Sequence, residues 1–214
     1  MHPASPFRET HHATLIARAR AHPFALVCAA DGTRIHAAHA PILLDETEGA
    51  PILRFHLSAA NAVTSALLGG SGALIVFTGD HAYISPDWYE QADQVGTWNY
   101  LSVEAEGPVT HLDNAGSTRL LDDLSDLFEA GLSPKPPWTR AKMTPGRFDA
   151  MLPGIRAFSL APTRFEGITK LGQNKPQSAR ANVITALSNR EDGIAITNRL
   201  PRCRQGPAWP KGLE

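Results

Sequence analysis

The middle of this 214-residue chain gathers aromatic and hydrogen-bonding side chains in two nearby stretches. If HAYIS is extended, His81 and Tyr83 point to one side of a strand, and in TWNYL the same alternation separates Asn99 from Trp98 and Tyr100. Ring walls that exclude water beside a few fixed donors suit a flat heteroaromatic ligand. The alternative is that the rings are core or cross-strand pairs of an antiparallel sheet, and on residue chemistry alone this alternative ranks first.

A second group of polar side chains surrounds an expected change from strand to helix in RFHLSAANAVTSAL. Arg54, His56, Ser58 and Asn61 lie at this change. Backbone N–H groups of a first helical turn, together with hydroxyl and amide donors, can bind an anion such as phosphate. The alternative is that Ser58 and Asn61 only cap the helix.

A third group lies in KLGQNK, directly after an expected strand. Lys170, Gln173 and Asn174 offer a charge and amide donors there. The alternative, which ranks first for the motif in isolation, is a solvated turn before the last helix.

Other kinds of site have weaker signals. The pairs His11–His12 and His36–x–x–His39 lack a suitable third ligand nearby, so we predict no metal site. The spacing reveals no Ser-His-Asp or Cys-His arrangement, and we assign no catalytic residue. Because no G-x-G-x-x-G or P-loop follows a strand, no phosphate motif of that kind suggests NAD or ATP.

The formal net charge of −1 conceals an asymmetry along the chain. Residues 1–130 carry 6 Lys and Arg against 16 Asp and Glu, whereas residues 131–214 carry 14 against 5. The two parts could fold against each other, meet across a homodimer, or present a basic face to phosphate or DNA. The first option ranks highest, and binding of phosphate or of nucleic acid, such as DNA, through the basic C-terminal part comes next.

Hydrophobic periodicity predicts the elements that position these groups. The helix expected at 10–21 has Leu15 and Ile16 inward, and Asp31-Gly32 is expected to form a hairpin turn. The remaining expectations are strands in 24–44, 51–58, 72–79, 99–112 and 154–174 (with a break at Pro162), and helices in 58–72 (capped by Ser58, ended by Gly69-Gly70), 117–131 and 176–189.

Many short strands with single helices between them favour a mainly β, α+β architecture: a closed or nearly closed antiparallel barrel with peripheral helices. We expect one domain over residues 1–188 and a basic, Pro- and Gly-rich tail over 189–214 that is unfolded unless a partner orders it. No apolar run is long enough to span a membrane and the N-terminus lacks a secretion leader, so we expect a cytoplasmic protein. Cys28 and Cys203 are expected to be reduced thiols.

Several of these motifs resemble one family. HAYISPDWY, GTWNYLSVEAEG, KLGQNK followed by ARANVITAL, and FHLSAANA stand in the order found in the PaiB family of FMN-binding negative transcriptional regulators. The resemblance implies an FMN-binding split β-barrel of antiparallel Greek-key type and a homodimer with flavin sites at the subunit interface. It places His56, Ser58 and Asn61 near the flavin phosphate or ribityl chain, and Trp98, Asn99 and Tyr100 beside the ring. The predicted cofactor-binding set is Arg54, His56, Ser58, Asn61, His81, Trp98, Asn99, Tyr100, Lys170, Gln173 and Asn174.

The chain departs from the family pattern at one point. Relatives usually read HLARANP where this chain reads HLSAANA, so an arginine is missing at Ala59 and a proline at Ala62. The missing charged hydrogen bond is worth roughly 1.5 to 3 kcal/mol, which puts FMN binding at issue. We hypothesise that Arg54, or a basic residue in the C-terminal part of the partner subunit, replaces it.

Two alternatives to a regulator stay open. One is an FMN-dependent oxidoreductase that uses NAD(P)H, in which the protein only positions the flavin and tunes it. The other is a haem-binding relative of the same fold, with His39, His56 or His81 as the axial ligand.

Overall fold

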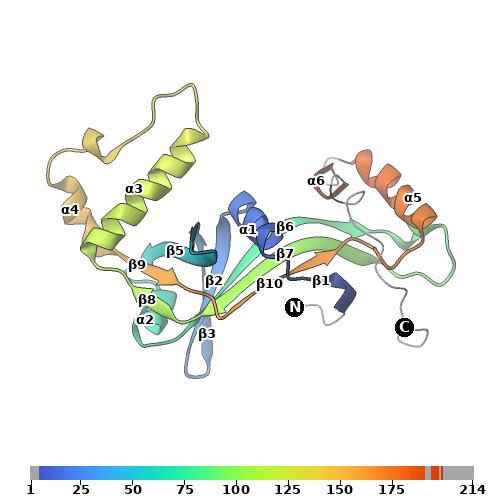
Figure 1. Ribbon diagram of the computed structural model, residues 1–214, viewed down its shortest axis with the longest axis horizontal. Helices are drawn as coiled ribbons and strands as arrows, with labels where there is room; N and C mark the ends of the chain where they lie inside the picture. The colour runs from blue at the N-terminus through green and yellow to red at the C-terminus, as the bar shows by residue number, and fades with distance from the viewer. Residues whose placement is uncertain (1–4, 191–193, 198, 200–214) are drawn as a thin grey trace. The chain divides into compact units, whose positions relative to one another are not determined.

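The computed structural model describes residues 5–190, 194–197 and 199. Figure 1 shows their course. The strands are β1 (Arg8–Glu9), β2 (Phe24–Asp31), β3 (Arg34–Pro41), β4 (Leu43–Thr47), β5 (Ala50–Ser58), β6 (Ala73–Ile84), β7 (Thr97–Gly107), β8 (Val109–His111), β9 (Ile155–Leu160) and β10 (Arg164–Lys170). The α-helices are α1 (His12–Ala21), α2 (Ala62–Leu68), α3 (Asn114–Ala130), α4 (Arg147–Met151), α5 (Gln177–Ser188) and α6 (Ile194–Thr197). Short 3-10 turns are η1 (Ser5–Phe7), η2 (Pro86–Tyr89), η3 (Arg140–Lys142) and η4 (Leu152–Gly154).

The strands form two sheets. The six-stranded sheet has the order β1-β10-β7-β6-β2-β3, and the four-stranded sheet has the order β4-β5-β9-β8. The pairings β1–β10, β2–β3, β2–β6, β4–β5, β5–β9 and β8–β9 are antiparallel. The expected mainly β, antiparallel class with peripheral helices is therefore confirmed. Hydrogen bonding leaves two open sheets, however, so the barrel is split and not closed.

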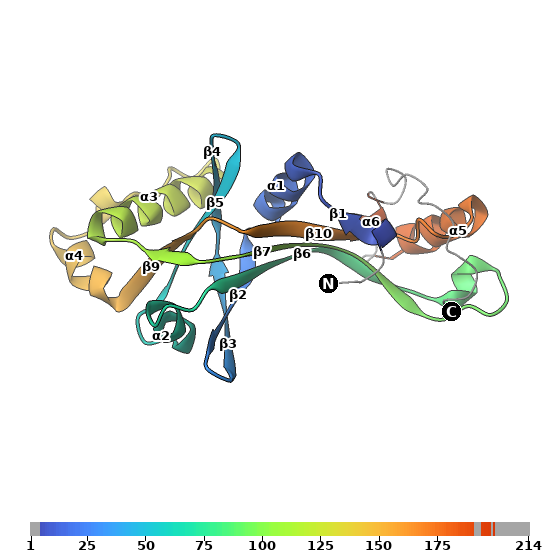
Figure 2. The same ribbon diagram turned by 60° about the horizontal axis from the view of Figure 1, so that its bottom comes forward.

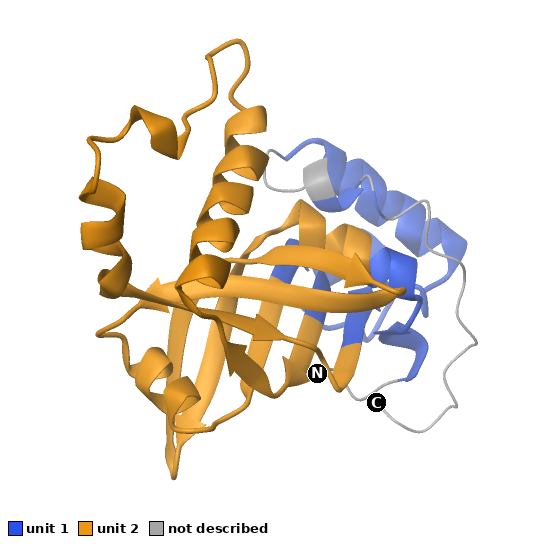
Figure 3. Cartoon of the chain, turned by 60° about the vertical axis from the view of Figure 1, so that its left-hand side comes forward, with its two compact units in different colours: residues 1–15, 78–103, 166–214 blue, residues 16–77, 104–165 orange. Residues whose placement is uncertain are grey.

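The chain divides into two compact units, which Figure 3 shows in different colours. Unit 1 comprises residues 1–15, 78–103 and 166–214, and unit 2 comprises residues 16–77 and 104–165. Strands β6, β7 and β10 contribute residues to both. The single domain over residues 1–188 stays a prediction. Most of the predicted tail, at 191–193, 198 and 200–214, lies outside the described residues.

The β2–β3 hairpin of unit 2 forms as predicted. Asp31 pairs with Arg34 across a two-residue turn. Gly32 in this turn has a φ of +56°, a left-handed conformation that glycine adopts without strain. Along β2, Ala25, Val27 and Ala29 are buried, so alternate residues face the core.

Other details of unit 2 differ from the prediction. Strand β4 is a separate strand that pairs with β5 through a turn at Glu48-Gly49, where both residues have positive φ. The expected strand over 99–112 is interrupted between β7 and β8 at Pro108, which has no N–H to donate. Helix α2 is capped by Asn61, whose Oδ1 accepts the Val63 N–H at 2.8 Å, and not by Ser58.

Helix α3 covers one face of the four-stranded sheet, as predicted for the helix over 117–131, and Figure 2 shows the two together. Leu120 and Leu124 pack with Ala157 of β9, and Leu43, Leu112 and Ile155 complete this cluster. Complete burial of one leucine side chain contributes roughly 1.5 to 3 kcal/mol. Helix α3 therefore shields this part of the sheet from solvent.

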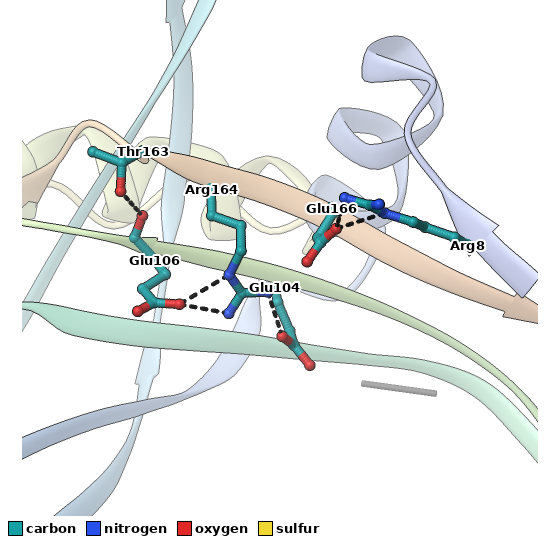
Figure 4. Close-up of polar contacts among 6 residues, drawn as sticks. All are labelled: Arg8, Glu104, Glu106, Thr163, Arg164 and Glu166. Carbon is teal, nitrogen blue, oxygen red and sulfur yellow. Dashed lines mark hydrogen bonds and ion pairs between the residues drawn. The ribbon is translucent and has the colours of Figure 1, made fainter. Parts of the chain in front are cut away.

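A charged cluster joins the ends of β7 and β10 in unit 2 (Figure 4). The Arg164 guanidinium donates to Glu104 at 2.8 Å and to Glu106 at 2.6 and 2.9 Å. The Thr163 N–H and hydroxyl both donate to the Glu106 carbonyl, at 2.9 and 3.1 Å. Gly107 is needed here, because a Cβ at this position would lie 2.7 Å from a backbone oxygen.

Unit 1 has its own core. Helix α5 contributes Ala179, Val183 and Leu187, which cluster with Ile84, Tyr89 and Leu171. At another point of the unit, β7 and β10 approach closely at Gly167, where a Cβ would lie 2.4 Å from the Ser102 carbonyl oxygen. The 85–103 segment is thus held by residues that follow it by about 70 to 100 positions in the sequence.

Candidate functional site

Strand β6 changes its register with respect to the core in unit 1. Buried positions alternate up to Gly79 and resume one residue out of phase at Ala82 and Ile84. One extra residue in a strand produces such a change, and β-bulges of this kind re-aim side chains near functional sites. As a result His81 and Tyr83 are exposed.

Beside them lies Trp98 of β7. Its ring centroid is 6.0 Å from that of Tyr83, with the rings edge to face, and 6.1 Å from that of His81. Trp98 is 53% exposed and Tyr83 is 50% exposed. The predicted alternation is confirmed, and the rings form cross-strand contacts that are open to solvent and do not belong to the core. We call His81, Tyr83 and Trp98 the aromatic cluster.

Two neighbours shape the aromatic cluster. The Nδ1–H of His81 donates to the Gly79 carbonyl at 3.0 Å, because a carbonyl oxygen can only accept. This leaves Nε2 as the nitrogen with a lone pair. Gly96 lies under the Tyr83 hydroxyl, so closely that a Cβ there would be 2.1 Å from the oxygen.

Asn99 lies on the opposite side of β7 and is 2% exposed. Its Oδ1 is buried and has no hydrogen-bond partner in the described part of the chain. A Cβ on Gly172 would lie 3.9 Å both from Asn99 Nδ2 and from Lys175 Cγ. The KLGQNK loop therefore approaches the amide of Asn99.

Two lysines of this loop also contact the 94–97 segment. Lys170 Nζ donates to Thr97 Oγ1 at 2.7 Å, and burial lowers the pKa of Lys170. Lys175 Nζ donates to Gln94 Oε1 and lies 4.9 Å from the centre of the Tyr89 ring. Sequence reasoning left Lys175 out of the site, although it ends the quoted motif.

The other predicted residues of the loop have different surroundings. Gln173 is 4% exposed and organises the backbone: its Oε1 accepts the Leu171 N–H at 2.8 Å, and its Nε2 donates to the carbonyls of Pro6 and Thr169. Asn174 is half-buried. Tyr100, on the Trp98 side of β7, is also half-buried.

The remaining predicted residues lie in unit 2 and are already engaged. Arg54 donates to Asp45 at 2.6 Å and approaches Asp123 of α3 at 2.8 Å. A phosphate at Arg54 would meet these two carboxylates. The positive charge of Arg54 is therefore already paired with carboxylates of unit 2.

His56 and Ser58 follow Arg54 on the same face of β5. His56 pairs with Ala157, which α3 covers, and burial lowers the pKa of His56. Its Nδ1 is buried without a partner among the described residues. Ser58 is exposed, and its Oγ accepts the Ala60 N–H at 3.4 Å.

The structure thus gathers His81, Trp98, Asn99, Tyr100, Lys170, Gln173 and Asn174 in unit 1, and Arg54, His56, Ser58 and Asn61 in unit 2. The unit 1 group suits a flavin in two respects: the exposed rings can stack on a planar ring, and two ammonium groups suit a phosphate. The buried amide of Asn99 lies on the opposite side of β7 from the exposed ring of Trp98. When bound, a flavin supplies electron transfer.

The comparisons with known proteins agree with this fold. A family model described as "Putative FMN-binding domain" matches residues 1–164. The Bacillus subtilis (strain 168) "Protease synthase and sporulation protein PAI 2" is 27% identical over 156 residues, covering 73% of this chain and 74% of that protein.

Solved structures share the architecture. The FAD and haem binding protein from Mycobacterium smegmatis has a TM-score of 0.58 at 18% identity, covering 83% of this chain and 79% of its own. The flavocytochrome Anf3 from Azotobacter vinelandii has a TM-score of 0.58 at 16% identity, covering 80% and 73%. None of the helices in the described residues has the length and apolar character needed to cross a membrane. The chain therefore belongs to the FMN-binding-domain family, with a split-barrel fold, that includes PaiB, the protein named PAI 2.

Proposed function

We propose that the chain is a homodimeric FMN-binding protein that lowers transcription, directly or through a partner. The observation that carries the flavin half is the aromatic cluster, because two large rings, Tyr83 and Trp98, are half exposed next to each other. Exposed rings beside fixed polar groups are typical of a ligand site.

In this proposal the isoalloxazine ring stacks on the exposed ring of Trp98. Lys170 and Lys175 attract the phosphate. This choice assigns the phosphate to the lysines of unit 1 and not to Arg54, whose guanidinium is held by Asp45 and Asp123.

The homodimer is supported by an open face of unit 2. Register pairs Leu26 with His39 and Cys28 with Ala37, so these residues share one face of the sheet. Phe24 is 67% exposed and Ile35 is 76% exposed on the same face. A groove of about 480 Å³, lined partly by Cys28, Ile35, Leu74 and Glu106, lies there. The apolar sheet face consists of Phe24, Leu26, Cys28, Ile35, Ala37, His39, Leu74 and Val76.

A second copy is the occupant that suits this face. Interfaces between copies of one chain have apolar centres and polar rims. The Arg164 cluster with Glu104 and Glu106 provides the charged rim in unit 2. Exposed apolar faces of this kind mark interaction sites.

The regulatory half has separate support. The similar Bacillus subtilis protein PAI 2 is named a protease synthase and sporulation protein. Residues 131–214 carry 14 Lys and Arg against 5 Asp and Glu, which favours attraction to DNA. A gel-shift series over salt concentration, with FMN-loaded and flavin-free protein, tests DNA binding. Sequence-specific repression requires binding to a preferred sequence that persists at moderate salt.

Flavin binding is tested on purified protein. We expect a yellow colour, release of FMN on denaturation, and quenching when FMN is titrated into flavin-free protein. Protein that neither retains nor binds FMN at micromolar concentrations would contradict the proposal. Bleaching by NADPH would instead favour the oxidoreductase.

One observation favours haem as a second candidate ligand. The Nδ1–H of His81 is fixed on the Gly79 carbonyl, which orients the ring and keeps Nε2 able to bind iron. His81 is exposed, whereas His56 is largely buried. Titration with haem checks this candidate: a Soret band that His81→Ala abolishes supports it, and the absence of a Soret band excludes it.

A further inference from the structure

A long exposed segment connects α3 to β9 in unit 2. Residues 131–151, which we call the arm, leave the end of α3 and return to the sheet through α4 (Figure 3). The arm exposes large apolar side chains: Leu132 is 53% exposed, Trp138 is 39% exposed and Met151 is 55% exposed. Such side chains gain free energy when a partner covers them.

The arm has a defined conformation. Glu129 of α3 accepts the Trp138 N–H at 2.7 Å and pairs with Lys135. Arg140 pairs with Asp122 at 2.9 Å and lies 4.6 Å from the centre of the Phe148 ring. A partner would therefore meet a surface that is already ordered, which lowers the entropic cost of binding.

Two cations of the arm are left for a partner. Lys142 donates to the Pro137 carbonyl, and neither Lys142 nor Arg147 forms a salt bridge in the described part of the chain. Both side chains are exposed. The arm thus offers apolar side chains together with positive charge.

A complementary segment lies in unit 1, at residues 85–96, which we call the acidic loop. Its carboxylates Asp87, Glu90 and Asp93 are exposed and have no ion pair among the residues described. Val95 is 79% exposed. The loop is held by the burial of Tyr89 and by the hydrogen bond from Lys175 to Gln94.

We infer that the arm of one copy docks on the acidic loop of a second copy. This inference rests on the proposed homodimer. In a two-fold dimer the contact occurs twice, with Lys142 and Arg147 of each copy facing the carboxylates of the other. Trp138 covers Val95. The acidic loop leads directly into Thr97 and Trp98, so the docked arm borders the aromatic cluster of the second copy.

Charge complementarity favours the acidic loop as the occupant of the arm. Lys142 and Arg147 are exposed cations, and Asp87, Glu90 and Asp93 are exposed carboxylates without an ion pair among the described residues. Complementary charges at a rim fix the register of an interface.

Charge reversal in two separate chains tests the contact. The arm variant carries Lys142→Glu and Arg147→Glu, and the loop variant carries Asp87→Lys, Glu90→Lys and Asp93→Lys. Each variant alone should dimerise at least about tenfold more weakly, because like charges face each other at both contacts. When the two purified variants are mixed, both contacts of a mixed dimer again join opposite charges. Native mass spectrometry of differently tagged chains should show mixed dimers well above the statistical share.

A matched control replaces the loop variant by Glu48→Lys. Glu48 is an exposed carboxylate with a positive φ on the β4–β5 turn, outside the acidic loop. Its mixture with the arm variant should show no excess of mixed dimers. A statistical mixture of arm and loop variants would overturn the docking and leave the homodimer intact. A wild-type chain that is monomeric would overturn both, and an arm variant that dimerises normally but loses DNA affinity would assign the arm to nucleic acid.

Discussion

Asn99 and His56 each bury a polar atom that finds no partner among the described residues. Such an atom costs about 1 to 3 kcal/mol when nothing satisfies it. The KLGQNK loop, with Lys175, approaches the amide of Asn99. His56 lies in the layer beneath α3, where burial lowers its pKa. The free energy of unfolding should therefore depend on pH.

The aromatic cluster gives the first prediction at this scale. Trp98→Ala should weaken FMN binding about tenfold or more, because stacking on an aromatic ring is worth roughly 0.5 to 1.5 kcal/mol beyond the area it buries. Titration of flavin fluorescence measures the affinity. The unfolding temperature should change little, since Trp98 is half exposed. Leu68→Ala, at a residue 51% exposed on α2, serves as the control; equal affinity of Trp98→Ala and wild type would refute the site.

His56 yields a prediction on pH. Burial lowers its pKa in the folded state below the ordinary 6.5, so between these two values the unfolded chain binds more protons and stability is lost as pH falls. His56→Gln should remove this loss, worth up to about 1.4 kcal/mol for each pH unit below 6.5. Denaturant unfolding of wild type and variant between pH 7.5 and 5 checks it. Parallel curves would show that His56 does not titrate on unfolding.

Arg54 separates structure from ligand binding. Arg54→Ala leaves Asp45 and Asp123 without their shared cation and should lower the free energy of unfolding by about 1 kcal/mol, because both carboxylates are partly exposed. FMN affinity at a temperature where the variant is folded should stay within about twofold of wild type. A loss of tenfold or more would return Arg54 to the phosphate, as the sequence hypothesis holds.

Among the elements, α2 shows how the choice of the N-cap residue decides where a helix begins. Both Ser58 and Asn61 have side chains that can cap a helix, and the sequence predicts Ser58 as the cap of the helix over 58–72. Asn61 is the cap because the chain makes a turn between β5 and α2, with the Asn61 N–H on the Ser58 carbonyl at 3.0 Å. Asn61→Ala should cost about 1 kcal/mol of stability, and Ser58→Ala at most a few tenths. Thermal unfolding of the two variants distinguishes them, and equal losses would contradict this assignment.

The predictability of the elements follows the range of the interactions that form them. The β2–β3 hairpin was predictable because Asp31-Gly32 and the alternation in FALVCAAD are local signals. The break at Pro162 has the same origin. Strand β4 was merged into its neighbour because Pro41 and the short LLDET stretch give little local contrast.

Long-range contacts could not be predicted from the sequence. Nothing near Arg54 in the sequence indicates Asp123 on α3 as its partner. This ion pair gives Arg54 a structural role in place of the predicted phosphate contact. The register change in β6 likewise depends on which side chains the core accepts, although HAYIS itself was expected to be extended. The aromatic cluster was therefore predictable in composition, whereas its exposure and its neighbours required the structure.

For the whole molecule, the apolar sheet face gives a test of self-association. Ile35→Asp places a charge at its most exposed apolar residue and should raise the dimer dissociation constant about a hundredfold, because a desolvated, unpaired carboxylate is costly. Sedimentation velocity over a range of concentrations measures it. Leu68→Asp is the matched control, since Leu68 is exposed on α2 and not on this face. A dimer that tolerates Ile35→Asp would exclude the apolar sheet face as the interface.

Unit 1 consists of three segments that are separate in the sequence, and this affects folding during translation. Once residue 165 has emerged from the exit tunnel, every segment of unit 2 is present, whereas unit 1 still awaits the stretch that brings Leu171, Val183 and Leu187. Nascent chains at that stage carry Ile84 and Leu101 without the helix that shields them. During the final part of translation the segment that carries the aromatic cluster is therefore most accessible to proteases and chaperones. The family model matches residues 1–164 and so ends just before the residues that cover this segment.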